Sequence, residues 1–284
     1  MFRPLKVYAL AAAWAACGAL AHGQAAATPT PTLQPQEKKA ERSQARASDA
    51  NLTPEAIAET VIIIHGGRPV LEQVRRTAVE RGRVVREVDD GPDVEITYER
   101  LFKRGETSDK DMIRINQKRS NLEYSIIYNE GRVWGVIRGT AFKPRQEELT
   151  DLDSYRLHGI ETLLRYKENG ATLNFVGKDK QKGIDLWILD LTDKQSRRTR
   201  YFISSQTGKV LWLEYEATPE GAAAPVKYRK TFHDYRIVQN TRTPYRVVLY
   251  AGDRKLQETQ VMTVTFGVKM EDSLFKEEAA AGSN

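Results

Sequence analysis

Cysteine is nearly absent from this sequence: the 284 residues include one, Cys17. It lies in an N-terminal apolar segment, so the rest of the chain can form no disulfide and offers no thiolate for catalysis or for a metal site. The four histidines give no sign of a metal site either, because none has the short spacing to another that marks a local zinc site. They are His22, His65, His158 and His233. We therefore expect no metal and no other cofactor.

Motifs of hydrolases and nucleotide-binding enzymes are lacking too. The chain has no Gly-rich phosphate loop and no G-x-S-x-G nucleophile elbow. VIIIHGG (61–67) has the His-Gly-Gly of an oxyanion loop, but a helix C-cap built from Gly66 and Gly67 explains it more simply. His233 and Asp234 are chain neighbours, so in a strand they would point to opposite faces and could not act together as base and orienting acid. The sequence predicts a protein that is not an enzyme and has no catalytic residues.

Long hydrophobic runs are also missing. The most apolar stretch, VYALAAAWAACGALA (7–21), is too short to span a bilayer. It follows two cations and ends in Ala-Leu-Ala, the small-x-small pattern that signal peptidase accepts. We predict that residues 1–21 are a secretory signal and that the mature protein is periplasmic. In an alternative interpretation Cys17 is lipidated and anchors the protein to the envelope.

Residues 22–51 contain Ala, Pro, Thr, Gln and charged residues with almost no large apolar side chain, which predicts a disordered tether. Residues 277–284 are expected to be a flexible tail, leaving 52–276 as one folded domain. The net charge of +6 is small and dispersed, which argues against nucleic acid as a partner. The basic clusters RRTR (197–200) and KYRK (227–230) could contact an anionic membrane surface, although a solvated sheet face is the interpretation we favour.

The folded domain begins with a helix signal and continues with strands. Thr53 suits an N-cap, and Pro54 and Glu55 suit the first turn of a helix that His-Gly-Gly would end. From Arg83 onward apolar residues alternate with polar ones in runs separated by short turns, which is typical of an antiparallel meander with one apolar face. About eleven such strands are too many to stay flat, so the sheet should curl into a barrel or an open barrel. One segment, 144–170, has helical periodicity instead and should cover an apolar face of the sheet.

The order of motifs in residues 165–276 resembles that of the LolA-like family of outer-membrane lipoprotein-sorting and carrier proteins. The residues that carry the resemblance are Gly183, Trp187, Leu189, Leu191, Tyr201, Ile203, Thr207, Gly208, Leu211, Phe232, Asp234, Tyr235, Val238, Pro244 and Phe275. The resemblance implies a mainly β (α+β) fold, a single strongly curved antiparallel half-barrel with an N-terminal helix and a mid-chain helical lid over an apolar face that holds acyl chains. The family glycine after Val238 is replaced by QNTRT (239–243), so we expect a longer turn there.

These features together predict a monomeric carrier or binding protein for lipid or lipoprotein acyl chains. Apolar strand positions are expected to form the cavity wall: Ile96, Tyr98, Tyr124, Ile126, Trp187, Leu189, Leu211, Leu213, Val247, Leu249 and Val264. The lid is expected to contribute Leu149, Leu152, Ile160 and Leu163. Alternation alone does not distinguish a cavity from a packed core, so a closed core built from the same residues is the alternative. A second functional hypothesis is an envelope-stress sensor or protein-interaction module on the same fold, with an envelope protein as its partner and no transport role.

Overall fold

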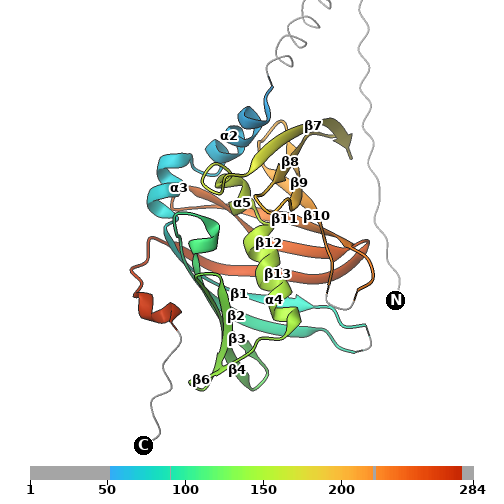
Figure 1. Cartoon of the computed structure of the whole chain (residues 1–284). Helices are drawn as coiled ribbons and strands as arrows, with labels where there is room; N and C mark the ends of the chain where they lie inside the picture. The colour runs from blue at the N-terminus through green and yellow to red at the C-terminus, as the bar shows by residue number, and fades with distance from the viewer. Residues whose placement is uncertain (1–51, 90, 220–221, 277–284) are drawn as a thin grey trace, which may run out of the picture. The chain divides into compact units, whose positions relative to one another are not determined.

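Antiparallel strands make up most of the computed structural model, which describes residues 52–89, 91–219 and 222–276 (Figure 1). All of these belong to one of the two units into which the chain divides, residues 51–284. The predicted signal segment 1–21, the tether 22–51 and the tail 277–284 lie outside the described residues.

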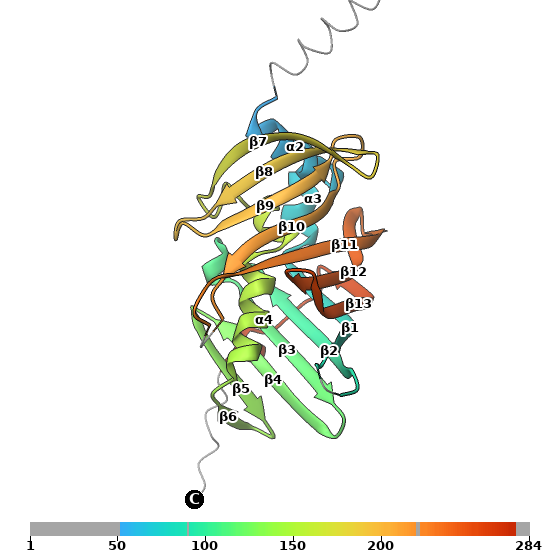
Figure 2. The same ribbon diagram turned by 90° about the vertical axis from the view of Figure 1, so that its right-hand side faces the viewer.

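In the described part of the chain, thirteen strands form one sheet, which is curved and open (Figure 2) and confirms the predicted α+β half-barrel. The strands are β1 (Thr77–Arg86), β2 (Val94–Lys103), β3 (Met112–Arg119), β4 (Leu122–Asn129), β5 (Arg132–Ile137), β6 (Thr140–Phe142), β7 (Thr172–Gln181), β8 (Ile184–Thr192), β9 (Arg198–Ser204), β10 (Val210–Ala217), β11 (Val226–Val238), β12 (Thr241–Ala251) and β13 (Arg254–Phe266). About eleven were expected. The three-residue β6 is too short to show a period, and β1 begins at Thr77 rather than near Arg83.

The spatial order of the sheet is β6-β5-β4-β3-β2-β1-β13-β12-β11-β10-β9-β8-β7. The first strand therefore pairs with the last, and this pairing joins two meanders, β1–β6 and β7–β13 (Figure 2). The register of β1 on β13 shifts between Arg81 and Gly82. A Cβ atom at Gly82 would lie 2.4 Å from the carbonyl oxygen of Gln260, so only glycine permits this approach of the two backbones.

The segment between β6 and β7 links the two opposite edges of the sheet, so it must cross the whole concave face. It contains two helices, α4 (Gln146–Leu157) and α5 (Ile160–Leu164), where one continuous helical stretch was predicted (Figure 1). The break falls at His158 and Gly159, because Gly159 has extended backbone angles and serves as the N-cap of α5. The predicted lid is therefore a helix pair.

Among the described residues, two helices precede the sheet. α2 (Pro54–Ile64) begins as predicted: the Thr53 hydroxyl accepts a hydrogen bond from the Ala56 amide at 3.1 Å. The helix ends at His-Gly-Gly, and a second helix, α3 (Arg68–Val74), follows that the sequence did not reveal. At Gly66, with φ 125°, a Cβ atom would lie 2.9 Å from the Asn240 carbonyl oxygen, so the α2–α3 turn rests directly on the β11–β12 turn.

The β11–β12 turn is tight, and the expectation of a longer turn was wrong. Val238 pairs with Thr241, leaving Gln239 and Asn240 as a two-residue connection. Both have positive φ, 47° and 62°, as hairpin turns that follow the twist of the strands require. Asparagine adopts this conformation readily, which offsets the missing glycine.

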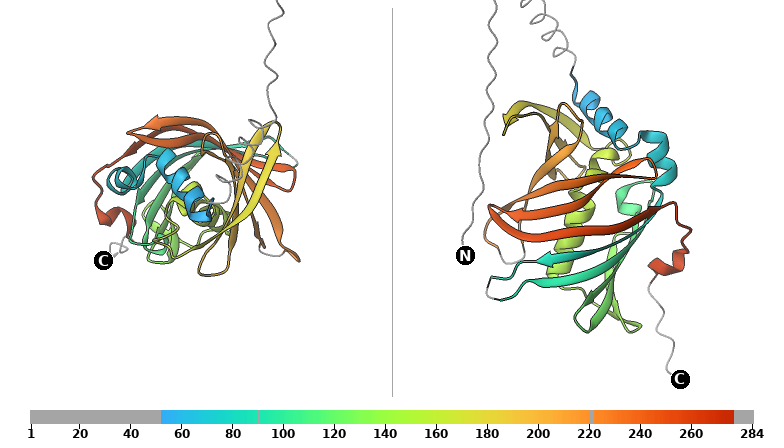
Figure 3. Two further views of the ribbon diagram at one scale, coloured as in Figure 1. Left: turned by 90° about the horizontal axis from the view of Figure 1, so that it is seen from above. Right: turned by 180° about the vertical axis from the view of Figure 1, so that it is seen from behind.

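The main hydrophobic cluster fills the end of the half-barrel formed by β8–β11 and includes residues of α2 and α5. Figure 3 shows α2, in blue, lying across this end of the sheet. It contains Ile57, Val61, Leu163, Leu189, Tyr201 and Leu213, all fully buried. A smaller cluster around Ile113, Ile126 and Leu152 lies under α4, and a third packs the 3₁₀ helix η2 (Asp272–Phe275) against β2, β4 and β5. One end of the half-barrel is thus a packed core.

Leu213→Ala should lower the free energy of unfolding by about 2–5 kcal/mol, because Leu213 is fully buried and its removal leaves a void. Leu122→Ala is the matched control; Leu122 is 47% exposed and should change stability by no more than about 0.5 kcal/mol. Urea unfolding followed by tryptophan fluorescence measures both. An unchanged midpoint for Leu213→Ala would mean that this side chain borders open space.

Candidate functional site

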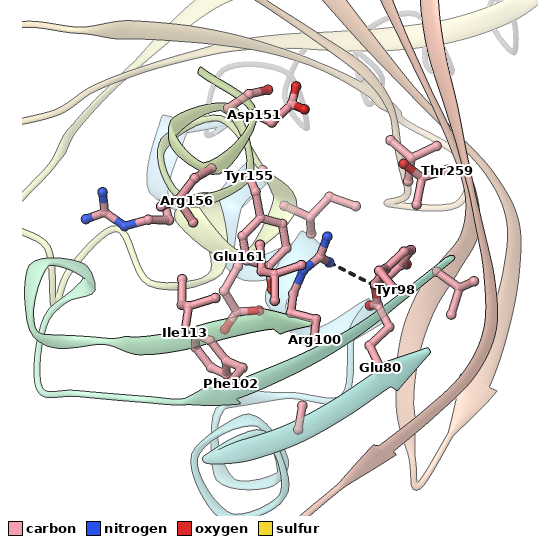
Figure 4. A pocket seen from close by; sticks show the side chains of 18 of the residues that line it. Glu80, Tyr98, Arg100, Phe102, Ile113, Asp151, Tyr155, Arg156, Glu161 and Thr259 are labelled. Atoms are coloured by element: carbon pink, nitrogen blue, oxygen red, sulfur yellow. Dashed lines mark hydrogen bonds and ion pairs between the residues drawn. The ribbon is translucent and has the colours of Figure 1, made fainter. Parts of the chain in front are cut away.

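A cavity of about 250 Å³ lies on the concave side of the sheet beneath α4 and α5 (Figure 4). Its walls come from β1, β2, β3, β4, β11, β12 and β13, the strands on both sides of the β1–β13 pairing, and its cover from the two helices. The apolar part of the wall consists of Ala78, Val84, Ile96, Phe102, Ile113, Ile115, Ile126, Phe232, Val247, Leu249, Val261, Val264 and Phe266. The middle of the half-barrel is therefore hollow, unlike the packed end.

Charged side chains also line this cavity. They are six cations and five acids: Arg75, Arg86, Arg100, Arg156, Lys230 and Arg242, with Glu80, Asp111, Glu148, Asp151 and Glu161. Most are compensated inside the cavity, since buried charge is costly unless it is paired. The Arg165 guanidinium, fully buried behind the wall, likewise donates to both carboxylate oxygens of Asp111 at 2.9 and 2.8 Å.

The guanidinium of Arg100, on β2, is one of the charges that are compensated inside the cavity. Arg100 Nη1 donates to Glu80 Oε1 at 2.8 Å, and the Tyr98 hydroxyl donates to the same oxygen at 2.7 Å (Figure 4). The Arg100 guanidinium lies 3.9 Å from the ring centroid of Tyr155 on α4. Burial raises the pKa of Tyr155 to about 12, so this ring stays neutral and presents its face to the cation.

Lys230 on β11 holds the C-terminal end of α4. Its Nζ donates to the carbonyl oxygens of Ser154 and His158, both at 2.8 Å, at the end of the helix where carbonyls lack intrahelical partners. Burial, together with the nearby positive charge of Arg100, lowers the pKa of Lys230 to about 7. Lys230 therefore connects β11 to the C-terminal end of α4 through buried hydrogen bonds.

The other attachments of α4 are polar as well. Arg86 on β1 forms ion pairs with Glu147 and Asp151. The Arg156 guanidinium lies 3.5 Å from the ring centroid of Tyr128 on β4. The Ser154 hydroxyl is 2.8 Å from that of Tyr215 on β10, and the rings of Tyr215 and His158 stack at 3.8 Å. Apart from Leu152, α4 is held over the cavity by hydrogen bonds, ion pairs and ring contacts.

A curved antiparallel sheet with helices across its concave face also describes several solved structures. A LolA superfamily protein from Nitrosomonas europaea superposes with a TM-score of 0.54 at 11% identity, covering 79% of this chain and 98% of its own. A DUF1329 family protein from Desulfovibrio piger gives a TM-score of 0.57 at 12% identity, with 80% and 98% covered. A domain from Vibrio parahaemolyticus named for outer membrane lipoprotein sorting gives 0.54 at 12% identity, with 79% and 98% covered.

The chain has the LolA-like fold. No protein-family model matches the sequence, and no curated protein matches it. The resemblance that the sequence motifs indicated is thus confirmed for the fold. Identities of 11% and 12% show similarity of fold alone. Within the part of the chain that the structure describes, none of the helices has the length and apolar character that crossing a membrane requires.

The cavity contains some of the predicted site residues. Ile96, Tyr98, Ile126, Val247, Leu249 and Val264 line its wall, and Leu152 and Ile160 line its cover. Trp187, Leu189, Leu213 and Leu163 belong to the packed cluster at the other end, and Tyr124 belongs to the cluster under α4. Leu211 lies where the register of β10 on β9 shifts, and Leu149 is half-buried on α4 outside the cavity lining. The cavity and the main cluster adjoin on the concave face, since Ile160 and Leu249 belong to both.

Sequence reasoning missed the charged cavity residues. KYRK (227–230) was interpreted as a solvated face, yet Tyr228 and Lys230 are buried and only the alternate residues point outward. The signal was the period of two, which places Lys230 on the same inward face as Tyr228 and Phe232. His233 and Asp234 do not meet: His233 Nε2 is 2.8 Å from the Thr231 hydroxyl, whereas Asp234 accepts from Arg236 at 2.6 Å. The described residues contain no cluster of three His, Cys, Asp or Glu side chains suited to a metal ion.

The lowered pKa of Lys230 predicts a pH-dependent stability. Between pH 7 and pH 9 the unfolded chain keeps a proton on this residue, whose ordinary pKa is 10.5, while the native state releases it near pH 7. The unfolded state then binds more protons, so the contribution of Lys230 to the free energy of unfolding should rise by up to about 1.4 kcal/mol per pH unit. Below pH 7 both states are protonated and the contribution is constant.

Urea unfolding at pH 7, 8 and 9 tests this expectation in Lys230→Met, which should lose that rise relative to the wild type. Lys227→Met, on the same strand but with a 59% exposed side chain, should keep it. Parallel pH profiles for wild type and Lys230→Met would contradict the assignment of a buried, titrating lysine.

Proposed function

We propose that this protein is a non-catalytic carrier or binding protein for lipid or lipoprotein acyl chains, which it holds in the cavity beneath α4. The observation that carries the proposal is a cavity on the concave side of a LolA-like sheet, with aliphatic and aromatic side chains from both meanders in its wall. Each methylene group transferred from water to such a wall gains about 0.8 kcal/mol, so a single chain supplies enough free energy to bind without any cofactor.

The size of the cavity favours a slender ligand. Its volume of about 250 Å³ is close to the lower limit of roughly 300 Å³ for small-molecule pockets, which suits one acyl chain rather than a lipid with several. The packed end of the half-barrel adds no space, because Leu189 and Leu213 are fully buried there.

The cover of the cavity suits repeated loading and release. Water can replace the hydrogen bonds and ion pairs of α4 when the helix moves away, whereas it cannot replace apolar contacts. Moving a helix attached through Arg86, Lys230 and Ser154 away from the sheet therefore costs less free energy than moving a helix with a broad apolar stripe. We place this activity in the periplasm, following the predicted signal segment, and expect a monomer.

A cavity-filling substitution tests the proposal. Val247→Trp adds bulk inside the cavity and should lower the affinity for a fluorescent acyl probe at least tenfold, while the existing space limits the loss of stability. Met262→Trp, on the neighbouring strand at a side chain 66% exposed, should change neither property. Mass spectrometry of lipids extracted from the natively purified protein should find an acyl-chain compound in the wild type and less in Val247→Trp.

If the wild-type protein binds no probe and carries no lipid, the proposal of a carrier function is contradicted. If such a protein instead retained a partner in a pull-down from envelope extract, the sensor or protein-interaction module would be the better assignment.

A further inference from the structure

Unsatisfied polar atoms are concentrated in the cavity. In the described part of the chain, eight buried side-chain nitrogen or oxygen atoms have no hydrogen-bond partner, and six belong to cavity-lining residues: His65, Arg75, Arg100, Arg156, Arg242 and Thr243. Buried polar groups are nearly always paired, so such a concentration indicates a site for something that supplies partners.

Four of these residues lie at one end of the cavity. His65 caps the C-terminus of α2, Arg75 caps that of α3, and Arg242 and Thr243 are the second and third residues of β12. The contact of the α2–α3 turn with the β11–β12 turn at Gly66 brings them together. The Arg242 amide donates to the His65 carbonyl oxygen at 3.4 Å. Burial lowers the pKa of His65 to about 4, and the positive charges of Arg75 and Arg242 both contribute to the lowering.

Positive charge exceeds negative charge at this end. Arg75 reaches Glu161 through Nη2 at 3.2 Å, which leaves its buried Nη1 unsatisfied. Arg242 forms no ion pair with any carboxylate of the described residues, and its Nε is buried and unsatisfied. A partly buried guanidinium without a counter-ion is unfavourable, so an incoming anion would be stabilised there.

The remaining two side chains complete a recognition surface. Thr243, 5% exposed, has a free hydroxyl that can donate. His65, fully buried, donates from Nδ1 to the Val61 carbonyl oxygen at 2.8 Å and leaves Nε2 without a partner. A bound anion would raise the pKa of His65 and allow Nε2 to donate as well.

Apolar surface begins directly beside these groups. The Arg75 guanidinium lies 5.1 Å from the ring centroid of Phe266, and Phe266, Val264 and Val261 continue along the cavity wall. We propose that Arg75, Arg242, His65 and Thr243 form an oxyanion subsite for the head group of a single-chain amphiphile, a carboxylate or a phosphate monoester, whose chain lies along this wall. The proposal rests on the proposed function and assigns the chemistry of its ligand.

Isothermal titration with three probes of equal chain length tests the subsite: dodecanoate, dodecyl phosphate and the uncharged dodecanol. In the full-length protein at least one of the two anions should bind about tenfold or more tightly than dodecanol. Arg242→Gln should remove that preference and leave dodecanol affinity within about twofold. Arg246→Gln is the matched control, since Arg246 is on the same strand, outside the cavity lining and 45% exposed. Thermal unfolding should show Arg242→Gln at least as stable as the wild type, because the substitution removes a charge without a counter-ion.

The outcomes separate the two proposals. Equal binding of all three probes, unaffected by Arg242→Gln, would overturn the oxyanion subsite and leave the acyl carrier intact. Failure of the wild type to bind any probe would overturn the carrier and the subsite together. If acetate or inorganic phosphate displaces the long-chain anion at comparable concentration, the subsite binds free ions, and the proposal that its ligand is an amphiphile is overturned. If Arg242→Gln is unstable, Thr243→Val, which removes only the free hydroxyl, should still lower the affinity for the preferred anion more than that for dodecanol.

Discussion

The pairing of β1 with β13 is the constraint on which the whole sheet depends. Each meander on its own would be an open sheet with two edges, and this one ladder joins them into a single concave surface. The cavity lies on both sides of the junction, with Ile96 and Ile113 from one meander and Val247 and Val264 from the other. Gly82, where the register shifts, lets the two backbones approach closely enough for that surface to be continuous.

The same topology determines how the cavity is covered. Because β6 and β7 are the opposite edges of the sheet, the chain between them must cross the concave face, and α4 is the result. An apolar helix on an apolar face would close the space permanently. The sequence instead provides a helix with one inward leucine, Leu152, and a series of polar groups that meet Arg86, Arg100 and Lys230 on the strands. The buried charges of the wall thus position the cover, and the surplus cations at the far end remain available for an anion.

Much of the fold could be predicted from the sequence, because local patterns determine it. Thr53 and Pro54 marked a helix at the start of the folded domain, and the period of two marked about eleven of the thirteen strands. The site could be predicted only in part: Val247 and Leu213 have the same apolar, alternating context, yet one lines a cavity and the other lies in a packed core. That difference arises from which helix covers each strand, a long-range property. Lys230 was missed because a charged residue in a strand normally points to solvent, although the period of two places it on the inward face with Tyr228 and Phe232. Arg242 was missed because it reaches the cavity just after the turn at Gln239 and Asn240, which rests on the α2–α3 turn, a long-range contact.

The junction of first and last strands also has a consequence for biosynthesis. Strands β1–β6 can pair with one another as soon as they are made, but β1 has no second neighbour until residues 254–266 emerge. For most of translation the nascent chain therefore presents a free strand edge, the kind of surface that recruits other chains into aggregates or swapped dimers. Truncation anywhere before β13 would leave that edge of β1 permanently exposed.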